Sequence, residues 1–450
     1  MADRFPDGPN HPDDDPQGQP NPFAGTPLEQ MFGAAGGQID MQAMFGQLQR
    51  MFAPHEGAVN WEYVRDLSRQ VVATQPDPSP DAALVSRVQD AARLAELWLD
   101  KATDFPATGT TAAVWSRAEW VENAMPAWQR LVEPVAKSVV DAMGNAMPEE
   151  ARALAGPMVG MLNQLGGAMF SQQIGQAVGG LAQEVVSASD IGVPLSQDHR
   201  PALVPANIAA FGSGLGVSDD DVLLYLMLRE CAHQRLFAAV PWLSDALFAA
   251  VAEYGEGITI DTSKIEQSLT QLDPSDINAM QEALGGGLFD LEPTAAQRAA
   301  LERLETTLAL VEGWVDEVVG QAATDVMPAS VPLREAVRRR RASGGPAEAT
   351  FAALVGLELR PRRLRDASAM WGAVRAADGT EARDAVWAHP QLLPTAADLD
   401  DPIGFAQRTR EADDLDVDSP EFDEALTALL DSDRKPGRDD DSGDRGTPAS

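Results

Sequence analysis

Five consecutive residues carry the clearest potential for chemistry in this sequence: Arg229-Glu230-Cys231-Ala232-His233. In a helical H-E-x-x-H motif, two histidines one turn apart bind a zinc ion, and the glutamate beside the first activates the bound water. Glu230 stands at the position of that general base and His233 at the position of the second ligand. Arg229 replaces the first histidine, and a guanidinium group keeps its proton and cannot coordinate a metal. We therefore expect a sharply reduced zinc affinity.

No other histidine or cysteine offers an evident replacement ligand. Cys231 is the only cysteine, which excludes an intrachain disulfide and a cysteine-based zinc site. It lies two residues before His233, and side chains two apart on a helix diverge, so we expect a small core residue and no Cys/His catalytic pair. The remaining histidines are expected in a loop (His199), in a C-terminal cap (His389), and in or beside an N-terminal arm (His11, His55).

The motif must sit on a helix that we predict over residues 222–240. Ser218 is the expected N-cap, with Asp221 at the third helical position, and Pro241 should end the helix. The apolar period is helical almost throughout from residue 61 onward, with another helix expected over residues 294–320. One short strand is expected over residues 257–261.

Two further elements follow from local signals. Ser79-Pro80-Asp81 predicts a helix start with Ser79 as the cap and Pro80 in the first helical position. The uncharged stretch 153–183 is interrupted by proline, polar residues and many glycines, so we expect a packed helix pair and no membrane span.

Composition restricts the classes of function. The chain has 450 residues, and 69 acidic residues against 34 basic ones give a net charge of −35, which repels nucleic acid and anionic membranes. We expect neither as a partner. The N-terminus lacks the basic start and apolar core of a signal peptide, and the single cysteine fits a reducing compartment, so a cytoplasmic location is expected.

Shifts in composition divide the chain into five predicted segments. Pro, Gly, Gln and Asp dominate the N-terminal arm, and acids dominate the C-terminal tail, so both are expected to be disordered. The segments are a disordered arm (1–56), an N-terminal helical domain (57–200), a motif domain (201–330), a C-terminal helical cap (331–410) and an acidic disordered tail (411–450).

A basic run, Arg338-Arg339-Arg340-Arg341, stands out in so acidic a chain. Such runs are usually solvated helix faces that pair with nearby acids. A patch for phosphate or an acidic partner is the alternative.

The sequence around the motif resembles a known family. The run LLYLMLRECAHQRLFAAVPWL is similar to the motif helix of the actinobacterial zincin-like family, which is described as zinc-dependent metalloproteases or hydrolases and is in part associated with deazaflavin-coenzyme biosynthesis. WSRAEWVENAMPAWQRLVEP upstream, and LVEGWVDEVV and AVWAHPQLLPTAADLDDP downstream, extend the resemblance over residues 59–410. It implies a mainly α, zincin-like helical metalloprotease fold.

The resemblance also implies a zinc cofactor and a ligand set. Glu230 matches the general base, His233 the second histidine ligand, and Glu312 the third ligand from another helix, while Arg229 departs from the pattern. If these residues still converge, the guanidinium of Arg229 can take the place of the metal cation. It would pair with Glu230 and Glu312, with His233 hydrogen-bonded beside them, as a structural salt-bridge cluster.

Three functions from different classes follow. The first is a degenerate, non-catalytic family member that binds a protein or peptide partner as a scaffold, which Arg229 favours. The second is an active zinc-dependent metallopeptidase or hydrolase with an atypical ligand set. The third is a metal-free hydrolase that uses Glu230 and His233 as an acid/base pair. Metal content and the response to a Glu230 variant separate them.

Overall fold

Helices form nearly all the regular structure, as the sequence predicts. The computed structural model describes residues 55–145, 156–257, 294–342, 350 and 363–413, which all lie in the unit formed by residues 51–450. The predicted disordered arm and tail fall almost entirely outside these ranges. The helices are α3 (Trp61–Val72), α4 (Ala82–Leu99), α5 (Arg117–Asn145), α7 (Gly156–Ala182), α8 (Pro205–Gly212), α9 (Asp219–Ala239), α10 (Pro241–Glu256), α13 (Ala295–Ala323), α14 (Ser330–Ala342), α16 (Leu364–Ala385) and α17 (Pro402–Asp413).

The motif helix α9 begins and ends where local chemistry dictates. Ser218 caps it, because its side chain accepts a hydrogen bond of 3.1 Å from the backbone N–H of Asp221, which confirms the predicted cap. Pro241 cannot continue the hydrogen-bond ladder of α9, and it occupies the first turn of α10 instead. The two helices meet at 93°.

Two local predictions were wrong. Helix α4 is capped by Asp81, whose side chain accepts from the N–H of Leu84, so the helix starts two residues later than a Ser79 cap would place it. The expected helix pair around residues 153–183 is one helix, α7, across residues 156–182. Pro157 does not break it, because a proline in the first turn removes no helical hydrogen bond.

The only strands in the described ranges are two short ones. β1 (Ala113–Val114) pairs in parallel with β2 (Ala202–Leu203), with Ala113 opposite Ala202, and Leu203 also forms an antiparallel bridge with Ser187. These pairings anchor the segment of residues 186–204, which we call the strap, beside α9. Of the strand predicted over residues 257–261, only Gly257 is described, as the C-cap of α10.

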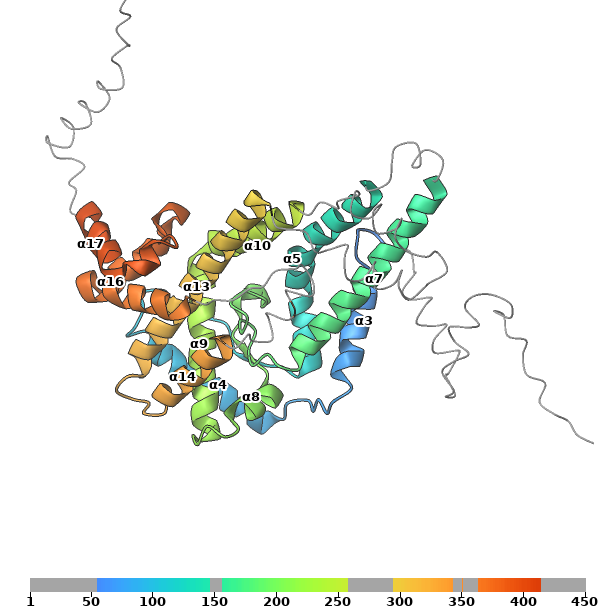
Figure 1. Ribbon diagram of the computed structural model, residues 1–450. Coiled ribbons are helices and arrows are strands. Elements are labelled where there is room, and N and C mark those ends of the chain that lie inside the picture. Colours follow the sequence, from blue (N-terminus) through green and yellow to red (C-terminus); the bar gives the residue numbers. More distant parts are fainter. Residues whose placement is uncertain (1–54, 146–155, 258–293, 343–349, 351–362, 414–450) are drawn as a thin grey trace, which may run out of the picture. The chain divides into compact units, whose positions relative to one another are not determined.

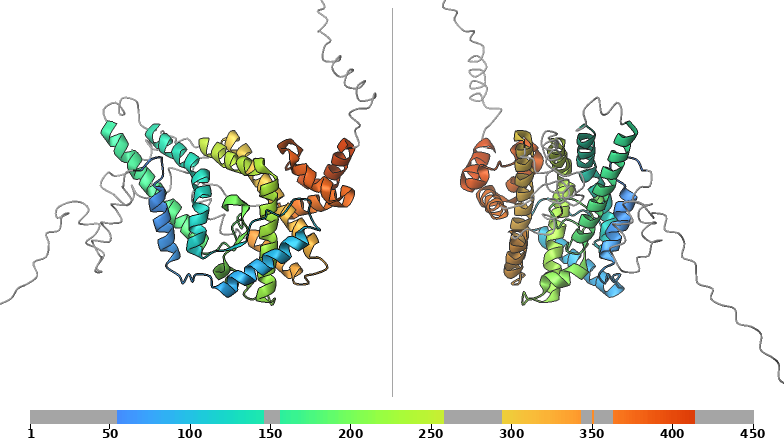
Figure 2. Two further views of the ribbon diagram at one scale, coloured as in Figure 1. Left: turned by 180° about the vertical axis from the view of Figure 1, so that it is seen from behind. Right: turned by 45° about the vertical axis from the view of Figure 1, so that its right-hand side comes forward.

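Buried apolar side chains form one cluster that extends from Val59 to Ala406. Helices from both sides of residue 200 pack together: α4 on α9, and α5 on α10. Helix α3 lies along α7, and α16 packs on α13 (Figures 1 and 2). The domain boundaries proposed at residues 200 and 330 stay a prediction.

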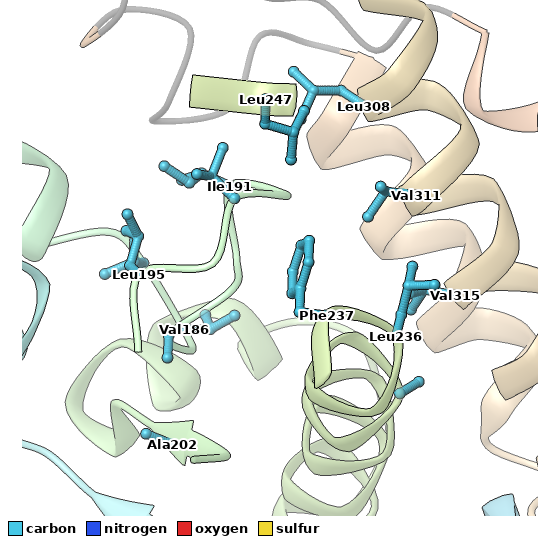
Figure 3. Close-up of a cluster of buried hydrophobic side chains, with 14 of the residues drawn as sticks. Val186, Ile191, Leu195, Ala202, Leu236, Phe237, Leu247, Leu308, Val311 and Val315 are labelled. Carbon is cyan, nitrogen blue, oxygen red and sulfur yellow. The ribbon is translucent and has the colours of Figure 1, made fainter. Parts of the chain in front are cut away.

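Helix α9 is buried on almost all of its faces. Its C-terminal end carries Leu236 and Phe237, which face Val311 and Val315 of α13 on one side and the strap on the other (Figure 3). A helix surrounded in this way must find partners for every polar side chain it carries. The strap and α13 therefore decide how the motif residues are satisfied.

No single described helix is long and apolar enough to cross a membrane, and the bent pair α9–α10 meets that test by length and composition only.

Candidate functional site

The motif residues lie in the buried middle of α9. The exposed fraction is 5% for Arg229, 0% for Glu230 and 3% for His233. Burial of a charged side chain costs free energy unless it is paired and hydrogen-bonded. The partners of these three residues therefore define what the site can do.

Glu312 of α13 is the centre of the cluster. Its Oε2 accepts a hydrogen bond of 2.7 Å from Nη2 of Arg229, and its Oε1 accepts one of 2.6 Å from Nη2 of Arg341. Nε2 of His233 lies 3.2 Å from the same Oε1. The sequence therefore predicted correctly that Glu312 meets Arg229 and His233. Arg341 was not predicted at this position.

The charge state of Glu312 follows from these neighbours. Burial alone would raise the pKa of its carboxyl, but the positive charges of Arg341, His233 and Arg229 outweigh it and hold the pKa well below its usual value. Glu312 is therefore a carboxylate, and both its oxygens already accept hydrogen bonds from guanidinium groups.

His233 is fixed by two acceptors. Its Nδ1 lies 2.9 Å from the backbone oxygen of Arg229, one turn earlier on α9, and its Nε2 faces the carboxylate of Glu312. A carbonyl and a carboxylate only accept hydrogen bonds, so both bonds form together only when both ring nitrogens carry a proton. In that state the imidazole has no free lone pair for a metal ion.

Glu230 points away from this cluster. Its Oε1 accepts from Nε2 of Gln234 at 2.9 Å, and its Oε2 accepts from the backbone N–H of Ser189 in the strap at 3.1 Å. The expected Arg229–Glu230 pair is therefore wrong: consecutive side chains on a helix diverge by about 100°. Burial raises the pKa of Glu230 despite these donors and the nearby His233.

Arg229 is not fully satisfied. Its Nη1 and the hydroxyl of Tyr225, one turn earlier, are buried and form no well-aligned hydrogen bond among the described residues, although Arg229 lies close enough to Tyr225 to oppose part of the rise that burial causes in the pKa of that hydroxyl. A buried donor without an acceptor costs about 1–3 kcal/mol. The cluster is thus held by the Glu312 pairing and is not optimised at every atom.

The basic run on α14 supplies most of the remaining charges. Arg340 binds Asp190 of the strap at 2.8 Å, and Arg338 binds Asp316 of α13 at 2.5 Å. The pKa values of both aspartates are lowered, because these arginines and their neighbours outweigh the effect of burial. The run pairs with acids, as expected, but these three arginines do not form a solvated face, since the side chains of Arg338, Arg340 and Arg341 are only 21%, 24% and 12% exposed. The acids lie 22, 150 and 29 residues away in the sequence, so a local pattern could not identify them.

The strap closes the cluster on another side. Gly192 adopts φ +77°, and a Cβ atom there would lie 3.2 Å from Oε1 of Glu312. Any larger residue at this position would crowd that carboxylate and would also strain the backbone. Ser189 and Gly192 of the strap thus lie against Glu230 and Glu312 respectively, and the strap accounts for much of their burial.

The residues present do not fit a zinc ion. Across the described ranges, no group of three or more His, Cys, Asp or Glu side chains is arranged to hold a metal. Two of the three ligand positions that the resemblance implies, His233 and Glu312, come together, but a guanidinium stands at the third and a second one covers the glutamate. His199 lies in the strap, and His389 caps a 3₁₀ turn near the C-terminal helices, while His11 falls outside the described residues.

Comparisons with known proteins show the fold and the family of the chain. The chain is similar to the crystal structure of a proposed hydrolase with a novel fold from Chloroflexus aurantiacus, with a TM-score of 0.55 and 20% identity, across 78% of this chain and 99% of that one. At this identity the likeness shows the fold alone. A comparison with curated proteins found no match. The family model described as zincin-like metallopeptidase matches residues 59–406. This chain therefore belongs to the zincin-like metallopeptidase family.

Proposed function

We propose that this chain is a degenerate, non-catalytic member of its family that acts as a binding or scaffold protein. One observation carries the proposal: guanidinium groups from Arg229 and Arg341 each bind one oxygen of Glu312. Arginine stays protonated under all ordinary conditions, so neither group can become a metal ligand. The permanent cations stand where the family would have a metal ion and its first ligand.

Solvent exclusion supports the same proposal. Glu230 is 0% exposed, and the strap contacts it through Ser189. A general base must come within about 3 Å of the water or substrate proton that it removes. With no exposed surface, Glu230 has no room beside it for a water molecule or a scissile bond in this conformation.

The partner in this proposal is a protein or peptide. The net charge of −35 argues against nucleic acid and anionic membranes. We place the protein in the cytoplasm, because its single, buried cysteine suits a reducing compartment. We also propose an actinobacterial origin and a link to deazaflavin-coenzyme biosynthesis, and the resemblance of the sequence is the only support for both.

An active enzyme is the alternative, and one observation favours it. The raised pKa of Glu230 is what a general acid/base near neutral pH needs, and His233 is retained one turn away. Either a zinc-dependent hydrolase with an atypical ligand set or a metal-free hydrolase could use it. The arginines paired with Glu312 weigh against the zinc-dependent hydrolase. The burial of Glu230 weighs against both enzymes.

An assay of peptide hydrolysis by the purified full chain separates these functions. We expect no cleavage of unfolded casein, with or without added zinc, while a zinc metalloprotease run in parallel cleaves it. Cleavage that is lost with a chelator and in His233→Ala would establish the zinc enzyme. Cleavage that resists the chelator and disappears in Glu230→Gln would establish the metal-free one. Either result overturns the proposal.

A further inference from the structure

A cavity of about 410 Å³ opens at the corner between α9 and α10. Its walls come from α5, the C-terminal end of α9, the first turns of α10 and residues 194–199 of the strap. None of Arg229, Glu230, His233 or Glu312 lines it. The cavity is therefore distinct from the motif cluster, although Phe237 lines it and has its ring centroid 6.3 Å from that of His233.

Much of the cavity wall is apolar. Pro126 and Ala127 of α5, Leu195 of the strap and Phe248 of α10 contribute to it. Pockets that bind small molecules are typically of this size, mostly apolar, with a few polar groups that orient the ligand. The polar groups here decide which ligand that is.

One carboxylate at the cavity has no charge partner. Arg130 and Asp245 also line the cavity, but they form an ion pair with each other, and the guanidinium of Arg130 lies 4.5 Å from the centroid of the Phe248 ring. Asp198 is exposed and makes no ion pair within the described ranges. His199 also lines the cavity, and with its imidazole counted as neutral, one arginine against two aspartates leaves the wall with a net charge of −1, carried by Asp198. A cationic ligand complements it.

The backbone holds Asp198 in an unusual conformation. Asp198 and His199 have φ of 57° and 50°, and they are the only non-glycine residues with positive φ in the described part of the chain. The turn is held from within, because the Oγ of Ser196 donates to the backbone oxygen of Arg200 at 2.8 Å. Two consecutive left-handed residues persist only where the surroundings impose them, and such positions concentrate at ligand sites.

We propose that this cavity binds a primary amine that carries an aromatic or similar apolar group, either a free amine or the N-terminal residue of a peptide. The ammonium pairs with the carboxylate of Asp198, and the apolar group packs against Pro126, Ala127 and Phe248. The inference does not depend on whether the motif cluster is catalytic, since the two sites share none of their polar residues.

Calorimetric titration of the full chain tests the proposal with three probes. Phenylalaninamide has the ammonium and the ring, whereas N-acetyl-phenylalaninamide has the ring without the charge. Phenylalanyl-alaninamide presents the same amine as a peptide N-terminus. We expect saturable binding of phenylalaninamide and of phenylalanyl-alaninamide. The affinity for the acetylated probe should be lower by roughly tenfold or more, because that probe cannot form the charge-assisted hydrogen bond. Tighter binding of the dipeptide than of the amide identifies the peptide as the source.

A matched pair of variants locates the binding. Asp198→Asn removes the charge and keeps a residue type that tolerates positive φ, so the turn should survive. We expect Asp198→Asn to lower the affinity for phenylalaninamide roughly tenfold. Asp325→Asn, at an exposed acid outside the cavity, should leave that affinity unchanged. Equal affinities for the charged and acetylated probes, an unchanged affinity in Asp198→Asn, or no saturable binding of any probe would overturn the proposal.

Discussion

Arg229 and Glu312 form a buried ion pair, with Nη2 of Arg229 2.7 Å from Oε2 of Glu312 and side-chain exposures of 6% and 1%. Helices α9 and α13, which carry them, are joined by no short connection, so the pair forms only in the folded chain. A buried pair of this kind contributes little net stability over an apolar pair, but loss of one partner leaves an uncompensated charge. The pair is therefore sensitive to single substitutions.

Replacement of Arg229 by an uncharged side chain of similar length should destabilise the protein. We expect Arg229→Met to lower the free energy of unfolding by about 3–5 kcal/mol, because Glu312 loses one of its two guanidinium partners inside the core. Urea unfolding followed by circular dichroism measures it. The matched surface control is Arg69→Met, which breaks the exposed pair with Glu122 and should cost less than about 1 kcal/mol. Equal effects of the two substitutions would contradict the account.

The basic run offers a comparison within one helix. Arg341 binds Glu312 and its side chain is 12% exposed, whereas Arg339 is exposed and makes no ion pair within the described ranges. We expect Arg341→Met to destabilise by roughly 2–4 kcal/mol and Arg339→Met to stay within about 0.5 kcal/mol of the wild type. If Arg339→Met were the more damaging variant, the run would not have the structural role assigned to it.

The sequence could predict the parts of this site whose interacting residues lie close together along the chain, and it could not predict the others. Ser218 as the cap of α9 followed from a local pattern, and so did the identity of the helix that carries the motif. Glu312 was found through resemblance to a family and could not be found from spacing. The partner of Arg341 lies 29 residues away and that of Arg340 lies 150 away, so the pairing depends on tertiary packing.

The strap was missed for a different reason. Ser189 contacts Glu230 through its backbone N–H and through its hydroxyl, which also accepts a hydrogen bond from Gln234. The sequence has no pattern that places this serine, 41 residues before Glu230, beside the motif. Gly192 is the exception, since a glycine at a close approach to a carboxylate is a recognisable choice once the structure is known. The start of α4 was missed by two residues because Ser79 and Asp81 are both good caps, and only packing selects one.

The pKa of Glu312 gives a prediction for pH dependence. The pKa in the folded chain is lower than in the unfolded chain, where a glutamate has its ordinary pKa of about 4.5, so the unfolded state takes up the proton first as pH falls. The stabilisation is therefore present above about pH 4.5 and is lost progressively in more acidic solution. Unfolding free energies measured at several pH values should fall with decreasing pH in this range.

The variant Glu312→Gln should flatten that dependence while lowering stability at pH 7. Glu302→Gln, at an exposed acid on the same helix, should leave the slope as in the wild type. Identical slopes for the wild type and Glu312→Gln would show that Glu312 does not have the depressed pKa assigned to it.

Cys231 reports on the integrity of α9 without any substitution. It is the only thiol in the chain, it is 0% exposed, and burial raises its pKa well above the usual value. We expect almost no reaction with a thiol-specific disulfide reagent in native buffer at pH 8, and one equivalent in urea. Rapid stoichiometric reaction of the native protein would mean that the motif helix is open to solvent.

Zinc binding by the purified full chain tests the central claim most directly: Arg229 and Arg341 occupy the place of the metal. After equilibrium dialysis against micromolar zinc, elemental analysis should find well under one zinc per chain that depends on His233. The double variant Arg229→His/Arg341→Met, which restores a histidine and frees Glu312, should retain more zinc than the wild type. One zinc per wild-type chain, lost in a folded His233→Ala variant, would contradict the account.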